Sequence, residues 1–245
     1  MRPPCATACT RAAAASAALA HLAALLDRAD APAADEAAWR TLAGESLHRL
    51  GRTSEAESAY EAALAALQYA PELSVASRIY AGLAMVHGQM GELDEALELA
   101  EVALNFAAGR DEGEARAHQR LAQIRWRRGD HDESVVHGLA ALERYGRVRD
   151  RRGQAAARNN LGLAYAALGR TDEAMTEFRA AVDGFDRTGS EHGLACALDN
   201  LAQLYAGAGD SDEAMVHLER AVEILVRIGM GPEGVVAAMW QGGCW

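Results

Sequence analysis

A segment that recurs at nearly constant spacing constrains the fold of this chain more than any other feature. The run LGLAYAALGRTDEAM, which begins at Leu161, returns as LAQLYAGAGDSDEAM at Leu201, and weaker copies begin at residues 43, 83 and 121. Aligned on one glycine, the copies are 40, 38, 40 and 40 residues apart, at Gly51, Gly91, Gly129, Gly169 and Gly209. A repeat of this length buries its apolar face only by stacking on its neighbours. The sequence therefore predicts five stacked repeats in residues 36–229.

Each repeat is predicted to form two antiparallel helices joined at that glycine, because glycine accepts the left-handed conformation that ends a helix. Small residues recur seven positions before the glycine and twelve after it, where they let backbones approach. The later set comprises Ala63, Ala103, Ala141, Ala181 and Ala221. A glutamate recurs four positions after the glycine, in the first turn of the second helix, and the predicted N-caps before it are Thr53, Thr171 and Ser211. The predicted fold class is all-α.

The fourth repeat carries the fullest motif, in the order L-G-x-x-Y, G, A, F and A. Its residues are Leu161, Gly162, Tyr165, Gly169, Ala174, Phe178 and Ala181. This pattern resembles the tetratricopeptide repeat. The period of about 40 exceeds the family's usual 34 or so, as in kinesin-light-chain-like repeats and in repeat domains of Streptomyces antibiotic regulatory-type bacterial regulators. The resemblance implies a right-handed α-α superhelix whose first helices line a concave groove. The third repeat fits least, with Arg125 and Gly138 at aromatic positions.

Segments outside the repeats are expected to cap the stack, since an unstacked repeat would expose its apolar face. Residues 1–9 are expected to be a flexible tail. Residues 10–35 are expected to form a capping helix, from Thr10 to Arg28, and a linker. Residues 230–245 are expected to form a partial sixth repeat, from Pro232 to Trp240, and a tail.

Charge and cysteine content argue against several classes of partner. The 24 basic residues are all arginine and face 35 acidic ones, so the formal charge of −11 disfavours binding of DNA or anionic membranes by the whole chain. The cysteines, Cys5, Cys9, Cys196 and Cys244, are neither dense nor at zinc-ribbon spacing, so no disulfide framework is predicted. No apolar run approaches the roughly 20 residues of a membrane span. We therefore expect a cytoplasmic protein.

Motifs that resemble cofactor or catalytic sites have simpler explanations in the repeat. The string GMGPEG, which begins at Gly229, matches a dinucleotide fingerprint but follows a predicted helix rather than a strand. Carboxylate pairs such as Asp172 and Glu173 recur at the same place in repeats two to five, which indicates helix-start electrostatics rather than an acid and base pair. The histidines lack zinc-protease spacing. The sequence therefore predicts no enzyme, no cofactor and no metal site.

A first predicted binding surface lies on the first helices of repeats four and five. Asn160 and Asn200 stand nine residues before their turn glycines, and the resemblance to long-period members of the family implies that they face the groove. A carboxamide there both donates to and accepts from the backbone of an extended peptide. Asn159, Asp199 and Gln203 complete this predicted surface. The alternative is that the asparagines bond to a neighbouring helix.

A second predicted surface is rich in arginine. Twelve of the 24 arginines fall between Arg110 and Arg158, where eight carboxylates leave a local charge of +4 against −15 for the rest of the chain. The resemblance directs the following residues into the groove: Arg78, Gln89, Arg116, Gln119, Arg120, Gln123, Trp126 and Arg127. Guanidinium groups bind carboxylates bidentately, so an acidic partner is predicted. The alternative is that these arginines pair with acidic residues of neighbouring helices and that the tryptophan is ordinary packing.

These features favour a binding scaffold for a protein or peptide, and a homo-oligomer is compatible with them. The alternative function is a regulatory or sensor domain of a bacterial transcriptional regulator that lacks its DNA-binding part. No basic recognition helix or helix-turn-helix segment is visible, so no nucleic acid is expected to bind to this chain alone.

Overall fold

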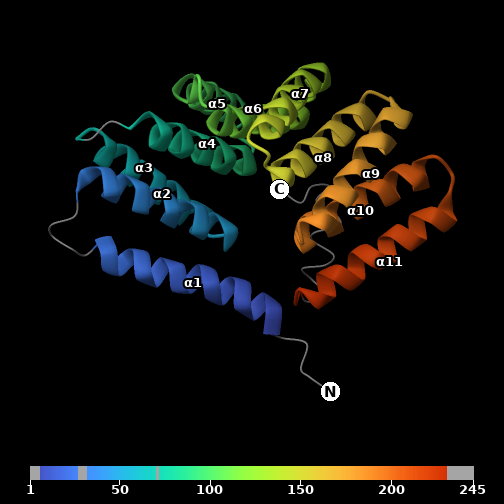
Figure 1. Cartoon of the computed structure of the whole chain (residues 1–245), viewed down its shortest axis with the longest axis horizontal. Helices are drawn as coiled ribbons and strands as arrows, with labels where there is room; N and C mark the ends of the chain where they lie inside the picture. The colour runs from blue at the N-terminus through green and yellow to red at the C-terminus, as the bar shows by residue number, and fades with distance from the viewer. Residues whose placement is uncertain (1–5, 27–31, 70–71, 231–245) are drawn as a thin grey trace. The chain divides into compact units, whose positions relative to one another are not determined.

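The computed structural model describes residues 6–26, 32–69 and 72–230, which form eleven helices and no strand (Figure 1). The helices are α1 (Ala6–Leu26), α2 (Ala33–Arg49), α3 (Thr53–Leu67), α4 (Leu73–Met90), α5 (Leu93–Ala107), α6 (Asp111–Arg128), α7 (His131–Arg147), α8 (Arg151–Ala167), α9 (Thr171–Arg187), α10 (Glu191–Gly207) and α11 (Ser211–Arg227). The predicted all-α fold is confirmed within these ranges. No helix in them is long and apolar enough to cross a membrane.

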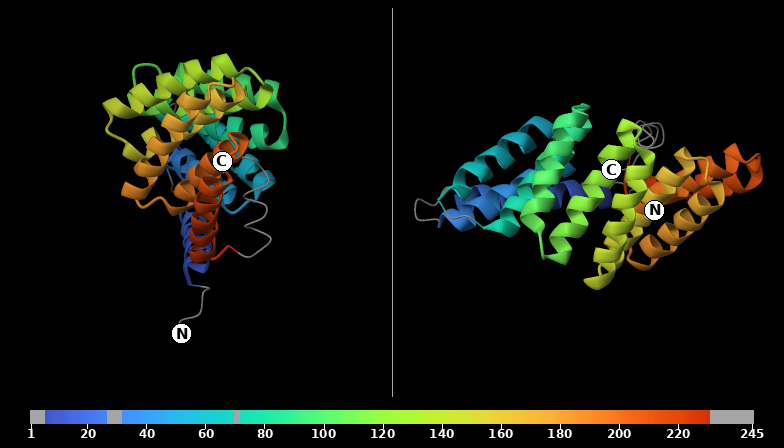
Figure 2. Two further views of the ribbon diagram at one scale, coloured as in Figure 1. Left: turned by 90° about the vertical axis from the view of Figure 1, so that its right-hand side faces the viewer. Right: turned by 90° about the horizontal axis from the view of Figure 1, so that it is seen from above.

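The described helices belong to two compact units, and each unit stacks its helices in succession. The N-terminal unit, Thr10–Arg128, contains α2 to α6, and the C-terminal unit contains α7 to α11. In the first, α2 packs on α3 and α4 on α5, while α4 also touches both α2 and α6. In the second, α8 packs on α9 and α10 on α11, while α8 also touches α10. Figure 2 shows these partners side by side. The first helices of the repeats therefore share one face within each unit.

The turn glycines end the first helices as the sequence predicts. The φ angles are 73°, 87°, 93°, 73° and 86° at Gly51, Gly91, Gly129, Gly169 and Gly209. After α8, the amide of Arg170 donates to the carbonyl of Tyr165 at 2.9 Å, a bond that the left-handed glycine permits. The orphan carbonyls at the end of each first helix thus find partners in the turn itself.

The predicted N-caps are wrong. Thr53, Thr171 and Ser211 are the first residues of α3, α9 and α11 rather than the caps before them. At α9 the preceding residue is Arg170, whose Nε donates to the carboxylate of Glu173 at 2.6 Å. Pairing of an arginine with a glutamate in the first turn therefore replaces the expected hydroxyl cap at α3 and α9, whereas the carboxylate of Asp210 caps α11 by accepting from the amide of Glu213 at 3.3 Å.

The small residues of the motif are buried, and aromatic rings fill the space that their size leaves. Each of the five alanines twelve positions after the turn glycine is 0% exposed: Ala63, Ala103, Ala141, Ala181 and Ala221. Phe178 on α9 lies against Gly162 of α8 so closely that a Cβ on the glycine would stand 2.6 Å from the ring. Tyr60 on α3 lies in the same way against Gly44 of α2, at 2.8 Å. A small residue and a ring therefore form one packing unit.

The third repeat solves the same packing problem without an aromatic residue on its second helix. Gly138 occupies the aromatic position on α7, and a Cβ there would lie 2.8 Å from Cδ2 of Leu161 on α8. Leu161 is 0% exposed. A side chain from the next helix therefore fills the space that the ring occupies in other repeats.

Several expectations concern the ends of the chain. The leading helix α1 is present as Ala6–Leu26, and its role as a cap stays a prediction. The expected partial sixth repeat and the C-terminal tail lie outside the described residues. Cys196 on α10 is buried and disulfide-bonded, which the cysteine spacing did not indicate.

Candidate binding surface

Buried carboxamide and carboxylate side chains gather, among the described residues, on one surface of the C-terminal unit. Asn159 and Asn160 on α8 are 7% and 9% exposed, and Asp199 and Asn200 on α10 are 8% and 6% exposed. Groups of this polarity are seldom so deeply buried unless they are hydrogen-bonded. We call these four residues, together with Gln203 on α10, the asparagine cluster.

Hydrogen bonds satisfy part of the asparagine cluster. The side-chain amide of Asn200 donates to Oδ1 of Asn159 at 3.0 Å and so links α10 to α8. Within α10, the amide of Gln203 donates to Oδ2 of Asp199 at 2.9 Å. Asn200 thus bonds to a neighbouring helix, which is the arrangement that the sequence left open as the alternative to a role in the groove.

One donor of the asparagine cluster has no partner. Nδ2 of Asn160 is buried and makes no hydrogen bond. A buried polar atom left without a partner costs about 1–3 kcal/mol. On α10, burial raises the pKa of Asp199, although the bond from Gln203 opposes that rise. The surface therefore holds an amide donor without an acceptor, and a carboxylate that burial makes harder to ionise.

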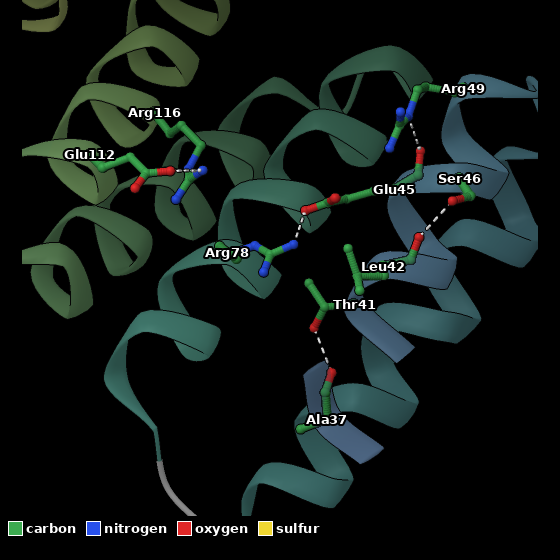
Figure 3. A network of polar contacts seen from close by, with 9 residues as sticks. All are labelled: Ala37, Thr41, Leu42, Glu45, Ser46, Arg49, Arg78, Glu112 and Arg116. Atoms are coloured by element: carbon green, nitrogen blue, oxygen red, sulfur yellow. Dashed lines mark hydrogen bonds and ion pairs between the residues drawn. The ribbon is translucent and has the colours of Figure 1, made fainter. Parts of the chain in front are cut away.

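The predicted arginine-rich residues all lie in the N-terminal unit, on α4 and α6. On α4, Gln89 is exposed, while Nη2 of Arg78 forms an ion pair with Oε1 of Glu45 at 2.7 Å. That pair joins α4 to α2, because its partners are 33 residues apart. Figure 3 shows Arg78 reaching across to Glu45.

The residues predicted on α6 make both local and longer contacts. Arg116 pairs with Glu112 one turn earlier at 2.9 Å. Arg120 donates to Oε1 of Gln123 at 2.8 Å, and Arg127 donates to the carbonyl of Gly88 on α4. The two remaining predicted residues, Gln119 and Trp126, are partly buried, and each has an interaction partner. The predicted surface is therefore an internally bonded polar network rather than a row of free side chains.

Sequence reasoning missed four residues beside Arg78 and Arg120. Glu45, His48 and Arg49 lie on the last turns of α2, and Tyr60 lies on α3. The positions of Glu45, His48 and Arg49 carry no motif that the other repeats share, whereas Tyr60 occupies the aromatic position of the packing motif, which indicates burial but not a polar role. The signal that was available is Gly82, which stands nine residues before Gly91, where repeats four and five have asparagine and repeat three has Arg120.

A separate cluster of potential metal ligands in the N-terminal unit is explained by ion pairing. Nδ1 of His87 lies 2.7 Å from Glu92 and 3.5 Å from Glu95, and its Nε2 lies 3.6 Å from Glu57. The ligand atoms of His87, Glu92 and Glu95 all fall within 4.8 Å of one another. Both glutamates are exposed, and hydrogen bonding to the imidazole accounts for the arrangement. The prediction of no metal site stays a prediction.

Comparison with known proteins gives the identity of the repeat. A family model described as a tetratricopeptide repeat matches residues 34–109, 113–187 and 154–225. The chain belongs to the tetratricopeptide repeat family. A search of curated proteins finds no match to it.

Several solved structures share the fold. BtubC (BKLC) from P. vanneervenii is 24% identical, with a TM-score of 0.67 over 91% of this chain and 93% of that one. A Rap protein complexed with competence and sporulation factor is 19% identical, with a TM-score of 0.72 over 79% of this chain and 55% of that one. A putative kinesin light chain from Podosopora anserina with nearly identical TPR-like repeats is 22% identical, with a TM-score of 0.58 over 77% of this chain and 93% of that one. The predicted resemblance to kinesin-light-chain-like repeats is confirmed.

Placed in register, the tetratricopeptide repeats of this chain carry residues of different chemistry at one position of the first helix. We call the residue nine positions before each turn glycine the ladder position, occupied by Leu42, Gly82, Arg120, Asn160 and Asn200. Along the chain, Gly82 offers no side chain, Arg120 offers a cation, and the last two repeats each offer the carboxamide of an asparagine. Since each side chain lies on a first helix, the shared face of each unit carries a different chemistry.

Proposed function

We propose that the chain is a protein-interaction scaffold that binds an extended peptide segment of its partner along the first helices of the repeats. The observation that carries this proposal is the buried Nδ2 of Asn160, which lacks an acceptor beside the bonded pair of Asn159 and Asn200. A peptide carbonyl is a suitable acceptor for this amide. Binding would thus satisfy a donor that is unsatisfied in the free protein.

One of the similar structures supports a binding role for this fold. One of them, the Rap protein, is described as complexed with competence and sporulation factor, and this chain spans about half of it, 55%. The TM-score of 0.72 places the described helices on the same fold. We infer that this chain also binds a partner, and we do not infer that its partner is competence and sporulation factor.

The asparagine cluster also offers a way to hold a peptide in register. Asn200 already donates to Asn159 at 3.0 Å, so the two side chains have fixed orientations before any ligand arrives. Pre-organised polar groups lose less conformational entropy on binding than free ones. Asn160 supplies the donor beside this fixed pair.

The N-terminal unit extends the proposal to the chemistry of the partner. Its first helices carry Arg78 and Arg120, and guanidinium groups favour carboxylates. We infer that the partner segment is acidic, as the uneven distribution of arginine in the sequence predicts.

Selection of peptides followed by measured affinities tests the proposal. The full chain is used as bait for a phage-displayed library of random peptides, and enriched peptides are labelled for fluorescence anisotropy. Asn160→Ala should weaken their binding by about 1–2 kcal/mol, roughly 5- to 30-fold, because one buried hydrogen bond is lost. Asn105→Ala is the matched control, because Asn105 is an exposed asparagine on the second helix of repeat two. Equal affinities for wild type and Asn160→Ala would rule out this surface.

A further inference from the structure

Cys196 is a disulfide-bonded residue on α10, the helix that also carries Asp199, Asn200 and Gln203 of the asparagine cluster. Asn200 follows it by four residues and Gln203 by seven, and residues at this spacing share one face of a helix. At a rise of about 1.5 Å per residue, Cys196 lies about 6 Å along the helix axis from Asn200. A covalent cross-link is therefore attached at the edge of the proposed binding surface.

The burial of Cys196 distinguishes it from the residues at the same position in the other repeats. Thirteen residues before their turn glycines, repeats one to four have Ala38, Arg78, Arg116 and Ala156, and each of these is partly exposed. Cys196 is only 5% exposed. Position 196 is therefore covered by something that its counterparts lack, and the segment that carries the second cysteine of the disulfide is a suitable cover.

The composition of the chain leaves three cysteines as partners for Cys196. The sequence holds Cys5, Cys9 and Cys244 besides Cys196. A bond to Cys244 closes a loop of 48 residues, whereas a bond to Cys9 closes one of 187. Shorter loops close at a lower cost in chain entropy, which favours Cys244.

The C-terminal segment also leaves the fold close to Cys196. The last residue of α11, Arg227, pairs through Nη2 with Oε1 of Glu191, the first residue of α10, at 3.0 Å. The described residues end at Met230, and Cys244 follows 14 residues later. A segment of that length spans up to about 46 Å when extended, while α10 is only about 25 Å long. It is therefore long enough to bring Cys244 to Cys196.

We propose that Cys244 is the partner of Cys196, and that this disulfide holds residues 231–245, which lie outside the described residues, across the asparagine cluster as an internal ligand. In the oxidised chain the segment covers the face of α10 that carries Asn200 and Gln203, so an external peptide has to displace it. A thiol reductant releases the segment and opens the surface. Access of a peptide to the asparagine cluster therefore depends on the redox state of the chain.

The release is an ordinary thiol–disulfide exchange. A dithiol attacks the bond, and its two thiols end as one cyclic disulfide. The two electrons and two protons that the dithiol gives up appear as the free thiols of Cys196 and Cys244.

The effect of this tether on peptides rests on the proposed function, but the tether itself does not. The bond between the two cysteines and the docking of the segment are both measured without a peptide. Failure of the proposed function and failure of the tether are therefore distinguishable.

Trypsin digestion of the full chain, oxidised and without reductant, identifies the partner of Cys196. Cleavage after arginine places Cys196 in residues 188–220, Cys244 in residues 228–245, and both remaining cysteines in residues 1–11. Mass spectrometry should find residues 188–220 joined to residues 228–245 in a chain that migrates as a monomer, and dithiothreitol should separate them. A link from residues 188–220 to residues 1–11, or to a second copy of the chain, would overturn the assignment.

Amide hydrogen exchange tests whether the segment docks once it is bonded. Residues 231–245 should exchange about tenfold more slowly in the oxidised chain than in the reduced chain. Cys244→Ser, which changes no described helix, should exchange at the fast rate in both states. Cys5→Ser is the matched control and should behave as wild type. Equal exchange rates in oxidised and reduced wild type mean a bond without docking, and the internal ligand is then refuted.

Peptides selected under reducing conditions measure the effect on binding by fluorescence anisotropy. The reduced chain should bind them about tenfold more tightly than the oxidised chain, because a segment that covers the surface nine-tenths of the time leaves about one-tenth of the protein competent. Cys196→Ala and Cys244→Ser should bind with the reduced affinity in both states, whereas Cys9→Ser should keep the difference. Equal affinities of oxidised and reduced wild type would show that the segment does not cover the asparagine cluster. If no peptide is selected, the proposed function fails, and hydrogen exchange still decides the tether.

Discussion

Replacing Gly162 by alanine should destabilise the chain, although alanine is the better helix former. In the middle of a helix this change gains roughly 0.5–1 kcal/mol through backbone entropy. At Gly162, however, the new Cβ would stand 2.6 Å from two carbons of the Phe178 ring. The ring is 1% exposed and so is enclosed by neighbouring residues. Overpacking a core costs about 1–3 kcal/mol, so a net loss of about 1 kcal/mol or more is expected.

Gly146→Ala is the matched control in the same unit. Gly146 on α7 is exposed, and no atom lies within 4 Å of the place where its Cβ would be. This variant should gain up to roughly 0.5–1 kcal/mol. Urea denaturation of the full chain, followed by circular dichroism, compares the midpoints of the two variants with wild type. If Gly162→Ala denatures at or above the midpoint of Gly146→Ala, the close packing of α8 on α9 is refuted.

Three other perturbations have defined outcomes. Ala181→Leu and Ala221→Leu should each lower stability by roughly 1–3 kcal/mol, because both alanines are 0% exposed; unchanged denaturation midpoints would contradict this. Arg149→Gly should raise the melting temperature, with a gain of about 0.5–1 kcal/mol, because φ is 56° at Arg149 and left-handed backbone is costly with a side chain; a lower Tm would count against it. The pKa of His48 is lowered from 6.5 to about 4, mainly by burial and then by the charges of Arg120 and Arg49. As the pH falls, the unfolded chain therefore takes up a proton on this histidine before the folded chain does. Stability should be complete above pH 6.5 and fall between pH 6.5 and 4, and His48→Gln should reduce this slope; identical slopes would refute the assignment.

The fold could be predicted because the repeat constrains it at many positions at once. The five alanines from Ala63 to Ala221 share one register, and a strand or an irregular loop at any of them would break the spacing of the rest. Turn glycines add a conformational requirement that few other residues meet. The N-caps could not be predicted in the same way. Thr53 and Arg52 compete for the start of α3, and a bond from Arg52 to Glu55 at 2.6 Å accompanies the observed start.

The candidate site was predictable in position but not in its bonds. Spacing alone located Asn160 and Asn200 on first helices, because the ladder position is counted from a glycine in the same repeat. The partner of Asn200 is 41 residues away, and the partner of Arg78 is 33 residues away. Such pairs depend on rotamers and on how two helices are offset, which the spacing of a repeat does not specify.

Tyr60 shows most clearly what the sequence alone does not predict. In the sequence it is an aromatic residue of the packing motif, and its burial agrees with that role. Its hydroxyl fits against α4 only because Gly82, on a different repeat, has no side chain to block it. The phenylalanine at the same position in repeat four, Phe178, has no polar atom. One position of the packing motif thus buries a hydroxyl in repeat one and none in repeat four, which the shared spacing does not reveal.

Separation of packing from recognition explains how one repeat can carry several chemistries. The small residues and rings that join the helices leave the ladder position outside the packing motif in repeats three and four, whereas Gly82 of repeat two packs against the ring of Tyr60. Arg120 and Asn160 therefore occupy equivalent places with different chemistry. Substitutions at Arg120 or Asn160 should change which peptides bind while leaving the denaturation midpoint nearly constant, whereas Gly162→Ala should shift the midpoint and leave the peptide preference of the folded protein unchanged. Specificity and stability are then set by different residues of the same helix.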